Sequence, residues 1–178
     1  AALAGRGGLA PGPLLAELPE ERLAALLKPV GFHTRKARFL RATARRLLDR
    51  HGGDVPREAE ELLALEGVGP KMMTLLMQVC WDEDVGICVD THVHRIANRL
   101  GWVDTWSRGA SQNPERTRRA LERWLPRALW REVNPLLVGF GQQRCAAVRP
   151  ACAGCLVREL CPAAQEPAAQ SPRGRQKK

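Results

Sequence analysis

Apolar and polar positions along the chain recur with a helical period, and prolines and glycines mark where the predicted helices begin and end. A short helix is predicted from Pro19 to Leu27. A longer one follows Thr34, which can cap it, and ends near the glycines that begin at Gly52. Its apolar positions include Ala37 and Ala44, while arginines occupy other faces.

The same signals predict further helices at 56–64, 70–80, 91–100, 114–125 and 127–140. Pro135 should kink or divide the last of these. In the 70–80 helix the positions predicted to face the core are Met72, Met73, Leu76 and Val79. No segment alternates with period two, so an all-α chain of about seven or eight helices is predicted.

The stretch Leu65-Glu66-Gly67-Val68-Gly69-Pro70-Lys71 joins two of these predicted helices. Gly67 and Gly69 can adopt backbone angles closed to other residues, so the hairpin can present N–H groups to an anion. Pro70 fits the first position of a helix, which places Lys71 in its first turn, and a lysine amine can act as a nucleophile. The alternative is an ordinary interhelical turn followed by a solvated lysine.

Length and charge narrow the class of protein. The chain has 178 residues and a net charge of +9. The basic excess is not confined to the C-terminal tail, and it favours a polyanionic partner, with nucleic acid first and an anionic membrane surface second. No apolar run approaches the roughly 18 residues that span a bilayer, and no signal segment opens the chain. A soluble, intracellular protein is therefore expected.

Four of the six cysteines crowd into one short span with the pattern C-x6-C-x2-C-x5-C, at Cys145, Cys152, Cys155 and Cys161. Four thiolates suit either tetrahedral zinc or an iron-sulfur cluster. Zinc modules more often contain two C-x2-C knuckles and this span contains one, so the spacing favours a cluster, with disulfides third. Cys80 and Cys88 stand apart in apolar surroundings and are predicted to be core side chains.

Other polar residues near these motifs can be interpreted as structural or as functional. Asp90 precedes a predicted helix and is a good N-cap, and a fixed carboxylate can also assist a lysine amine or stabilise positive charge on a sugar carbon. His92 and His94 do not share a helix face as metal ligands would. His92 is predicted to support the site and His94 to lie on the surface. Arg149 brings positive charge to the cysteine loop, either to dock a nucleic acid backbone or as a plain surface arginine.

In their order and spacing, LEGVGPK, VDTHVHRIANRL and LLVGFGQQRC followed by the cysteine pattern resemble the endonuclease III branch of the helix-hairpin-helix DNA glycosylases, most of all its animal homologues. The resemblance covers roughly residues 8–164. It implies a helix-hairpin-helix glycosylase fold, all-α, with a helical barrel domain and an iron-sulfur cluster domain. The implied division is a frayed N-terminal end at 1–13, the barrel at 14–84, the cluster domain at 85–162 and a disordered basic tail at 163–178.

The resemblance also implies an activity. The protein would be a bifunctional DNA N-glycosylase and AP lyase of base excision repair, which removes oxidised pyrimidines from duplex DNA and nicks 3′ to the abasic site by β-elimination. Lys71 would be the nucleophile and Asp90 the catalytic carboxylate. The expected DNA contacts are Gly67, Val68 and Gly69 of the hairpin, together with His92 and Arg149 from the reasoning above. The implied ligands of a [4Fe-4S] cluster are Cys145, Cys152, Cys155 and Cys161.

The implied partner is double-stranded DNA with an oxidised pyrimidine or an abasic site. A monomer without membrane contact, in the nucleus and the mitochondrion, is expected. Two departures from the family pattern stand out. Glu66 occupies a place where the family usually has proline, and an early helix with a Ser-Gln-Thr stretch and an additional N-terminal helix are not found, so a fragment is expected. The alternatives are a non-catalytic helix-hairpin-helix DNA-binding fragment and a zinc-stapled helical interaction protein.

Overall fold

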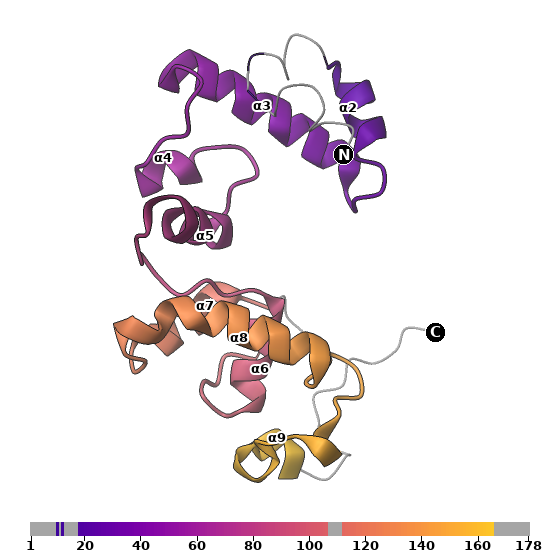
Figure 1. Ribbon diagram of the computed structural model, residues 1–178, viewed down its shortest axis with the longest axis vertical. Helices are drawn as coiled ribbons and strands as arrows, with labels where there is room; N and C mark the ends of the chain where they lie inside the picture. Colours follow the sequence, from indigo (N-terminus) through magenta and orange to yellow (C-terminus); the bar gives the residue numbers. More distant parts are fainter. Residues whose placement is uncertain (1–9, 11, 13–17, 107–111, 166–178) are drawn as a thin grey trace. The chain divides into compact units, whose positions relative to one another are not determined.

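The computed structural model describes residues 10, 12, 18–106 and 112–165, and the regular structure within those ranges is helical (Figure 1). Its α-helices are α2 (Glu20–Leu26), α3 (His33–His51), α4 (Ala59–Leu63), α5 (Pro70–Trp81), α6 (Thr91–Arg99), α7 (Pro114–Glu122), α8 (Trp130–Gln143) and α9 (Pro162–Gln165). Its 3-10 helices are η2 (Arg127–Leu129), η3 (Cys152–Gly154) and η4 (Arg158–Leu160). The predicted all-α class is confirmed for the described ranges.

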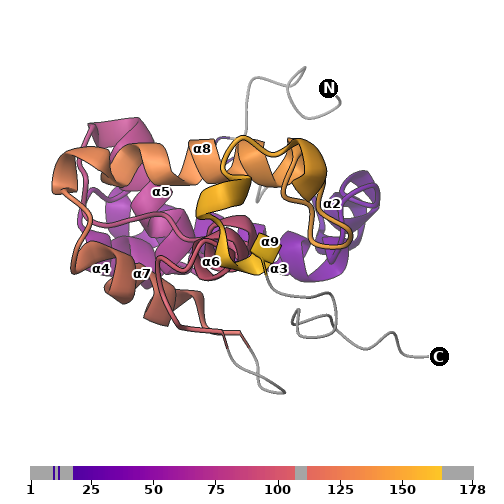
Figure 2. The same ribbon diagram turned by 90° about the horizontal axis from the view of Figure 1, so that it is seen from below.

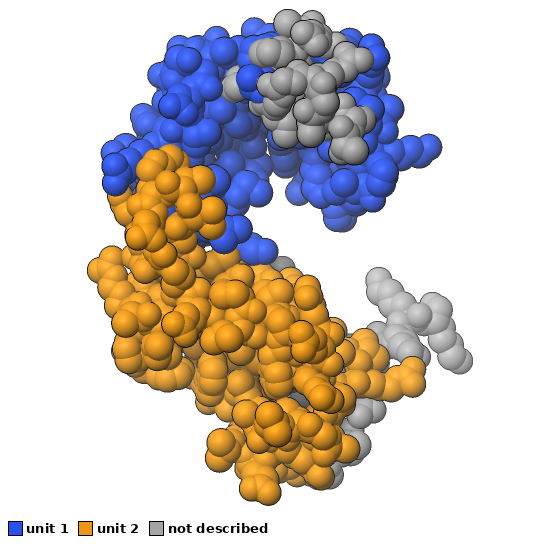
Figure 3. All heavy atoms as spheres, viewed as in Figure 1, with its two compact units in different colours: residues 1–77 blue, residues 78–178 orange. Residues whose placement is uncertain are grey.

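The chain divides into two compact units, Ala1–Met77 and Gln78–Lys178, which Figure 3 colours blue and orange. The domain limits expected from the sequence, with a boundary at 84/85, stay a prediction. Most of the expected frayed end at 1–13 lies outside the described residues, and so does the basic tail beyond Gln165. The first tail residues after Pro162 belong to α9.

The first unit is built on α3, which packs against α2. Leu23 of α2 is fully buried against Ala37 and Ala44 of α3, and α3 ends where Gly52 adopts a left-handed conformation with φ +60°. The prediction that Thr34 caps this helix is wrong. The chain turns at Phe32, which itself has φ 59°, so α3 already begins at His33 and Thr34 lies inside its first turn.

Helix α5 buries a different face from the one predicted. Met77 and Gln78 are buried, whereas Met72 is 50% exposed and Val79 is 74% exposed. Cys80 is exposed as well, contrary to the prediction of a core side chain. The reason is that α5 is apolar on most of its circumference, so hydrophobic spacing does not single out one face.

The core of the second unit lies around α6, which contacts α7 and α8 (Figures 1 and 2). Its buried side chains come from α6, α7, α8 and the segment before α6: Ile87, Val89, Val93, Ile96, Ala97, Leu121, Val133 and Leu137. Cys88 is buried, as predicted. Pro135 lies inside α8, which continues as one helix to Gln143, and Arg127–Leu129 forms a separate 3-10 turn before it.

None of the helices in the described ranges combines the length and the apolar character needed to cross a bilayer.

Candidate functional site

The glycine hairpin joins α4 to α5 in the first unit and depends on Gly67. This residue has φ +85°, and a Cβ added to it would lie 2.7 Å from Cδ2 of Phe39. Gly69 differs from the expectation, because its φ is not positive and an added Cβ would meet no described atom within 4 Å. Gly67 is therefore required by the turn and by its contact with Phe39, while Gly69 leaves open space in front of the hairpin.

The hairpin is fastened from two sides. The Val68 N–H donates to the Leu65 carbonyl at 3.1 Å, and the Thr43 hydroxyl of α3 donates to the Glu66 carbonyl at 3.0 Å. Within the described part of the chain, the N–H groups of Gly67 and Gly69 donate to no main-chain carbonyl. These two N–H groups, rather than that of Val68, are the ones suited to an external anion.

Lys71 follows as the second residue of α5, with an exposed side chain. The Gly69 carbonyl accepts a 2.9 Å hydrogen bond from the Met73 N–H, which begins the helix. Because Pro70 needs no N–H partner at the first helical position, the backbone passes from hairpin to helix without an unsatisfied donor there. Lys71 belongs to the first unit and Asp90 to the second.

Asp90 is the N-cap of α6, as predicted. Its Oδ1 accepts a 2.8 Å hydrogen bond from the Val93 N–H, and its backbone is extended, with φ −107°. Among the described residues no donor reaches its second carboxylate oxygen. The cap therefore fixes the carboxylate in space and leaves one oxygen able to serve a ligand.

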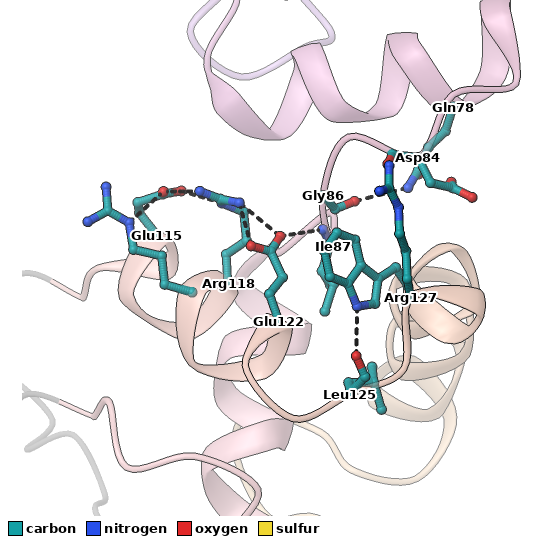
Figure 4. A network of polar contacts seen from close by, with 11 residues as sticks. Gln78, Asp84, Gly86, Ile87, Glu115, Arg118, Glu122, Leu125 and Arg127 are labelled. Atoms are coloured by element: carbon teal, nitrogen blue, oxygen red, sulfur yellow. Dashed lines mark hydrogen bonds and ion pairs between the residues drawn. The ribbon is translucent and has the colours of Figure 1, made fainter.

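The segment that leads to Asp90 is held by side chains of α5 and α7 (Figure 4). The Ile87 N–H donates to Glu122 Oε1 at 2.9 Å, and Gln78 Nε2 donates to the Gly86 carbonyl at 3.2 Å. Arg118 Nη1 donates to both oxygens of Glu122, at 2.8 and 2.7 Å. A Cβ at Gly86 would approach Glu122 Oε1 to 2.9 Å, so glycine lets the backbone reach this pair.

Arg118 also donates to Glu115, at 2.5 Å from Nη2 to Oε1 and 2.8 Å from Nε to Oε2. These bonds hold the pKa of Glu115 below its usual value, and the two carboxylates raise the pKa of Arg118. The Asn134 amide of α8 donates to the Cys88 carbonyl at 2.9 Å, which ties the segment before Asp90 to α8 as well. The position of Asp90 thus depends on polar contacts with α5, α7 and α8.

The two histidines of α6 have different surroundings. His94 is only 2% exposed, so the prediction of a surface residue is wrong. Its Nδ1 lies 2.6 Å from Thr117 Oγ1 and its Nε2 lies 2.8 Å from Gln112 Oε1, and the ring stacks on Trp106. Partners distant in sequence satisfy both ring nitrogens, which allows a polar ring to be buried. His92 is partly buried and packs near Gly141.

All four clustered cysteines line one pocket, and none of them forms a disulfide. Burial raises the pKa of the Cys161 thiol. Within the described ranges, no group of three or more His, Cys, Asp or Glu side chains is placed to hold a metal ion.

Two arginines of α6 hold the start of the cysteine loop. Arg99 donates to the carbonyls of Ala146 and Ala147 at 2.7 and 2.9 Å and to Cys145 Sγ at 3.3 Å. Arg95 is buried and donates to the Cys145 carbonyl at 2.6 Å. Burial, and then the neighbouring charge of Arg99, lowers the pKa of Arg95. Asp90 and the cysteine loop therefore meet opposite ends of the same helix.

Arg149 lies in the cysteine loop with an exposed side chain and φ 50°, an uncommon backbone angle for a residue with a side chain. Its role in DNA binding stays a prediction. Sequence reasoning missed Phe39, Glu122 and Arg118. Arg118 and Glu122 could have been found from the sequence. Arg118 stands three residues after Glu115 and four before Glu122, a spacing that predicts ion pairs along a helix. The contact of Phe39 with Gly67 has no such signal.

Comparison with known proteins gives a consistent result. Residues 14–127 match the family model described as HhH-GPD superfamily base excision DNA repair protein. The chain is 55% identical over 146 residues to the Endonuclease III-like protein 1 of Bos taurus, which covers 82% of this chain and 47% of that protein. It is 50% identical over 146 residues to the Endonuclease III homolog 1, chloroplastic, of Arabidopsis thaliana, covering 82% of this chain and 38% of that protein. The chain thus spans about half the length, or less, of these curated relatives.

Among solved structures, a trapped endonuclease III-DNA covalent intermediate superimposes with a TM-score of 0.78 at 29% identity, covering 87% of this chain and 70% of that chain. A non-covalent endonuclease III-DNA complex gives the same TM-score at 28% identity, covering 87% of this chain and 69% of that chain. The helix-hairpin-helix glycosylase fold expected from the sequence is confirmed by these likenesses.

Proposed function

Since the chain belongs to the HhH-GPD superfamily of base excision DNA repair proteins, we propose that it is a DNA N-glycosylase and AP lyase acting on oxidised pyrimidines in duplex DNA. One observation carries the proposal. The hairpin offers the N–H groups of Gly67 and Gly69 and continues directly into α5 with Lys71 in its first turn. A phosphate-binding turn is thereby joined to a nucleophilic amine.

The hairpin N–H groups bind a backbone phosphate, which positions the protein on the duplex without reading its sequence. The damaged nucleotide leaves the base stack at a cost of a few kcal/mol, which is smallest where damage has already weakened pairing. The open space before Gly69 supports this role, because a phosphate can approach the backbone closely there. Glu66, with its exposed side chain, adds a negative charge beside the phosphate and weakens the contact.

In the proposed chemistry, the Lys71 amine attacks C1′ of the extruded nucleotide. The C1′–N bond breaks and the base leaves with the electron pair and takes up a proton. Ring opening gives a protonated Schiff base between Nζ and C1′, which acidifies the C2′ proton. Loss of that proton and rupture of the C3′–O bond release the 3′ phosphate by β-elimination, and water then frees the lysine. The Asp90 carboxylate accepts the amine proton and stabilises positive charge at C1′.

The four cysteines of the shared pocket are the proposed ligands of a [4Fe-4S] cluster. Four free thiols around one pocket, with Arg99 donating to Cys145 Sγ, are a suitable donor set for it. When bound, the cluster would tie the cysteine loop together and supply an electron-transfer centre. Arg95 and Arg99 hold the cysteine loop against α6, which is the helix that Asp90 caps.

The proposed partner is duplex DNA with an oxidised pyrimidine or an abasic site, bound by a monomer. The net charge of +9 supports a polyanionic partner. Nuclear and mitochondrial localisation belongs to the same proposal. It rests on the likeness to the endonuclease III-like proteins.

The proposal is tested by single-turnover incision of a duplex with one thymine glycol. A strand break that leaves a 3′ unsaturated aldehyde and a 5′ phosphate, both identified by mass spectrometry, is the expected product. Equal affinity for damaged and undamaged duplex without incision would instead support the non-catalytic DNA-binding fragment.

A further inference from the structure

The long helix of the first unit carries a dense positive charge that the proposed chemistry does not use. Helix α3 contains seven arginine and lysine residues and a single acid, Asp49. Ala37 and Ala44 of this helix are buried against α2. Because a helix turns 100° per residue, Arg35, Arg38 and Phe39 lie away from that buried stripe.

Phe39 joins this positive face to the hairpin. Its ring lies so close to Gly67 that an added Cβ would meet Cδ2 at 2.7 Å and Cγ at 3.1 Å. One turn further along α3, Thr43 donates to the Glu66 carbonyl. Both contacts lie in the same unit, and through them the hairpin lies against this face of α3.

Two arginines are held on the Phe39 ring. The guanidinium carbon of Arg35 lies 5.5 Å from the ring centroid and that of Arg38 lies 5.4 Å from it, within the range of a cation–π interaction. Both side chains are exposed. Neither forms an ion pair with any residue in the described ranges, and Asp49 is about 15 Å along the helix from Phe39 at 1.5 Å per residue.

Packing alone does not account for two cations on one ring. An exposed cation–π contact is worth only about 0.5–1 kcal/mol, and two guanidinium groups near the same ring repel each other. Stacking does restrict their planar donor groups, and an arginine restricted in this way loses less entropy when it binds a phosphate through two parallel hydrogen bonds.

We propose that Arg35 and Arg38, held on Phe39 beside the hairpin, bind DNA backbone phosphates adjacent to the phosphate held by the Gly67 and Gly69 N–H groups. This inference rests on the proposed DNA-binding role of the hairpin. The arginines lengthen the contact along the backbone and supply the positive charge that offsets Glu66. They add affinity and salt dependence without base selectivity.

The test measures the affinity of the full chain for a duplex containing a stable abasic-site analogue, by fluorescence anisotropy between about 50 and 200 mM salt. The double variant Arg35→Gln, Arg38→Gln should bind about tenfold or more weakly and should lower the slope of log K against log salt by about 2, near 0.9 per lost phosphate contact. The control removes the same charge elsewhere in the unit, at exposed Arg22 and Lys28, as Arg22→Gln, Lys28→Gln.

A second variant separates charge from stacking. Arg35→Lys, Arg38→Lys should keep most of the salt slope but lose several-fold in affinity, because lysine is a point charge without a planar fork. If the glutamine pair behaves like the control pair while the wild type binds and incises DNA, the arginine contact is refuted and the proposed function stands. If the wild type neither binds nor incises damaged duplex, the proposed function is refuted, and the arginine contact that rests on it is refuted as well.

Discussion

The hydroxyl of Thr43 donates a 3.0 Å hydrogen bond to the carbonyl of Glu66 and so fastens the glycine hairpin to α3. This bond and the Phe39 ring against Gly67 set the position of the turn from the same helix. The positively charged helix thereby serves as the support on which the hairpin is held.

Replacing Thr43 by valine removes the hydroxyl and keeps the branched shape. Because the bond lies in an exposed setting, a loss of about 0.5–1 kcal/mol in the free energy of unfolding is expected, at the low end for a hydrogen bond. Urea unfolding measures it, with Thr34→Val in the first turn of the same helix as the matched control. Equal losses in the two variants would show that the bond does not hold the hairpin.

The two hairpin glycines should respond differently to alanine. Gly67→Ala should cost about 2 kcal/mol or more, because it combines a positive φ with a contact to the Phe39 ring. Gly69→Ala should change stability little, because an added Cβ meets nothing there, but it should weaken DNA binding by filling the approach to the backbone. Urea unfolding and anisotropy on both variants check this, and a stable, fully binding Gly67→Ala protein would contradict it.

Capping and catalysis by Asp90 can be separated with asparagine, which caps helices as well as aspartate does. Asp90→Asn should stay within about 0.5 kcal/mol of the wild-type stability yet lower the rate of incision by about 100-fold or more. Asp90→Ala should lower the rate of incision to a similar extent and should also lower the free energy of unfolding by about 1 kcal/mol, because alanine cannot cap α6. Unchanged incision by Asp90→Asn would mean that the carboxylate charge has only a structural role.

Acid should destabilise the second unit through Glu115. The pKa of this carboxyl is below its ordinary value of 4.5 because Arg118 and Arg119 bind it. Its contribution to stability is therefore present above that ordinary value and is lost as pH falls through the lower folded pKa.

The check is the free energy of unfolding of Glu115→Gln and wild type from pH 6 down to pH 3. The difference between them should be constant at the upper end and shrink below about 4.5, since the ordinary pKa of glutamate lies there. Glu60→Gln, at an exposed position of α4, is the control. A difference that stays constant to pH 3 would contradict the assignment.

The features that local chemistry determines were predictable from the sequence. Gly52 and Gly101 have positive φ at helix ends, and Asp90 and Asn113 cap α6 and α7 with their side chains. These depend on residues within a few positions of each other. The turn at Gly67 is local in the same sense, because its positive φ is a property that favours glycine.

Features that depend on distant partners were not predictable. His94 is buried because Thr117 and Gln112, far along the chain, bind its ring nitrogens. The buried face of α5 could not be read from a helix that is apolar on most sides. Phe39 is an ordinary apolar residue in the sequence until folding brings it against Gly67.

The most direct test of the proposed function is covalent trapping. The chain is incubated with a duplex carrying an abasic site or a thymine glycol, and borohydride is added to reduce any Schiff base to a stable amine. An adduct that maps to Lys71 by peptide mass spectrometry is the predicted result, lost in Lys71→Ala and kept in the control Lys28→Ala. Absence of an adduct, or an adduct that survives Lys71→Ala, would contradict the assignment of Lys71 as the nucleophile.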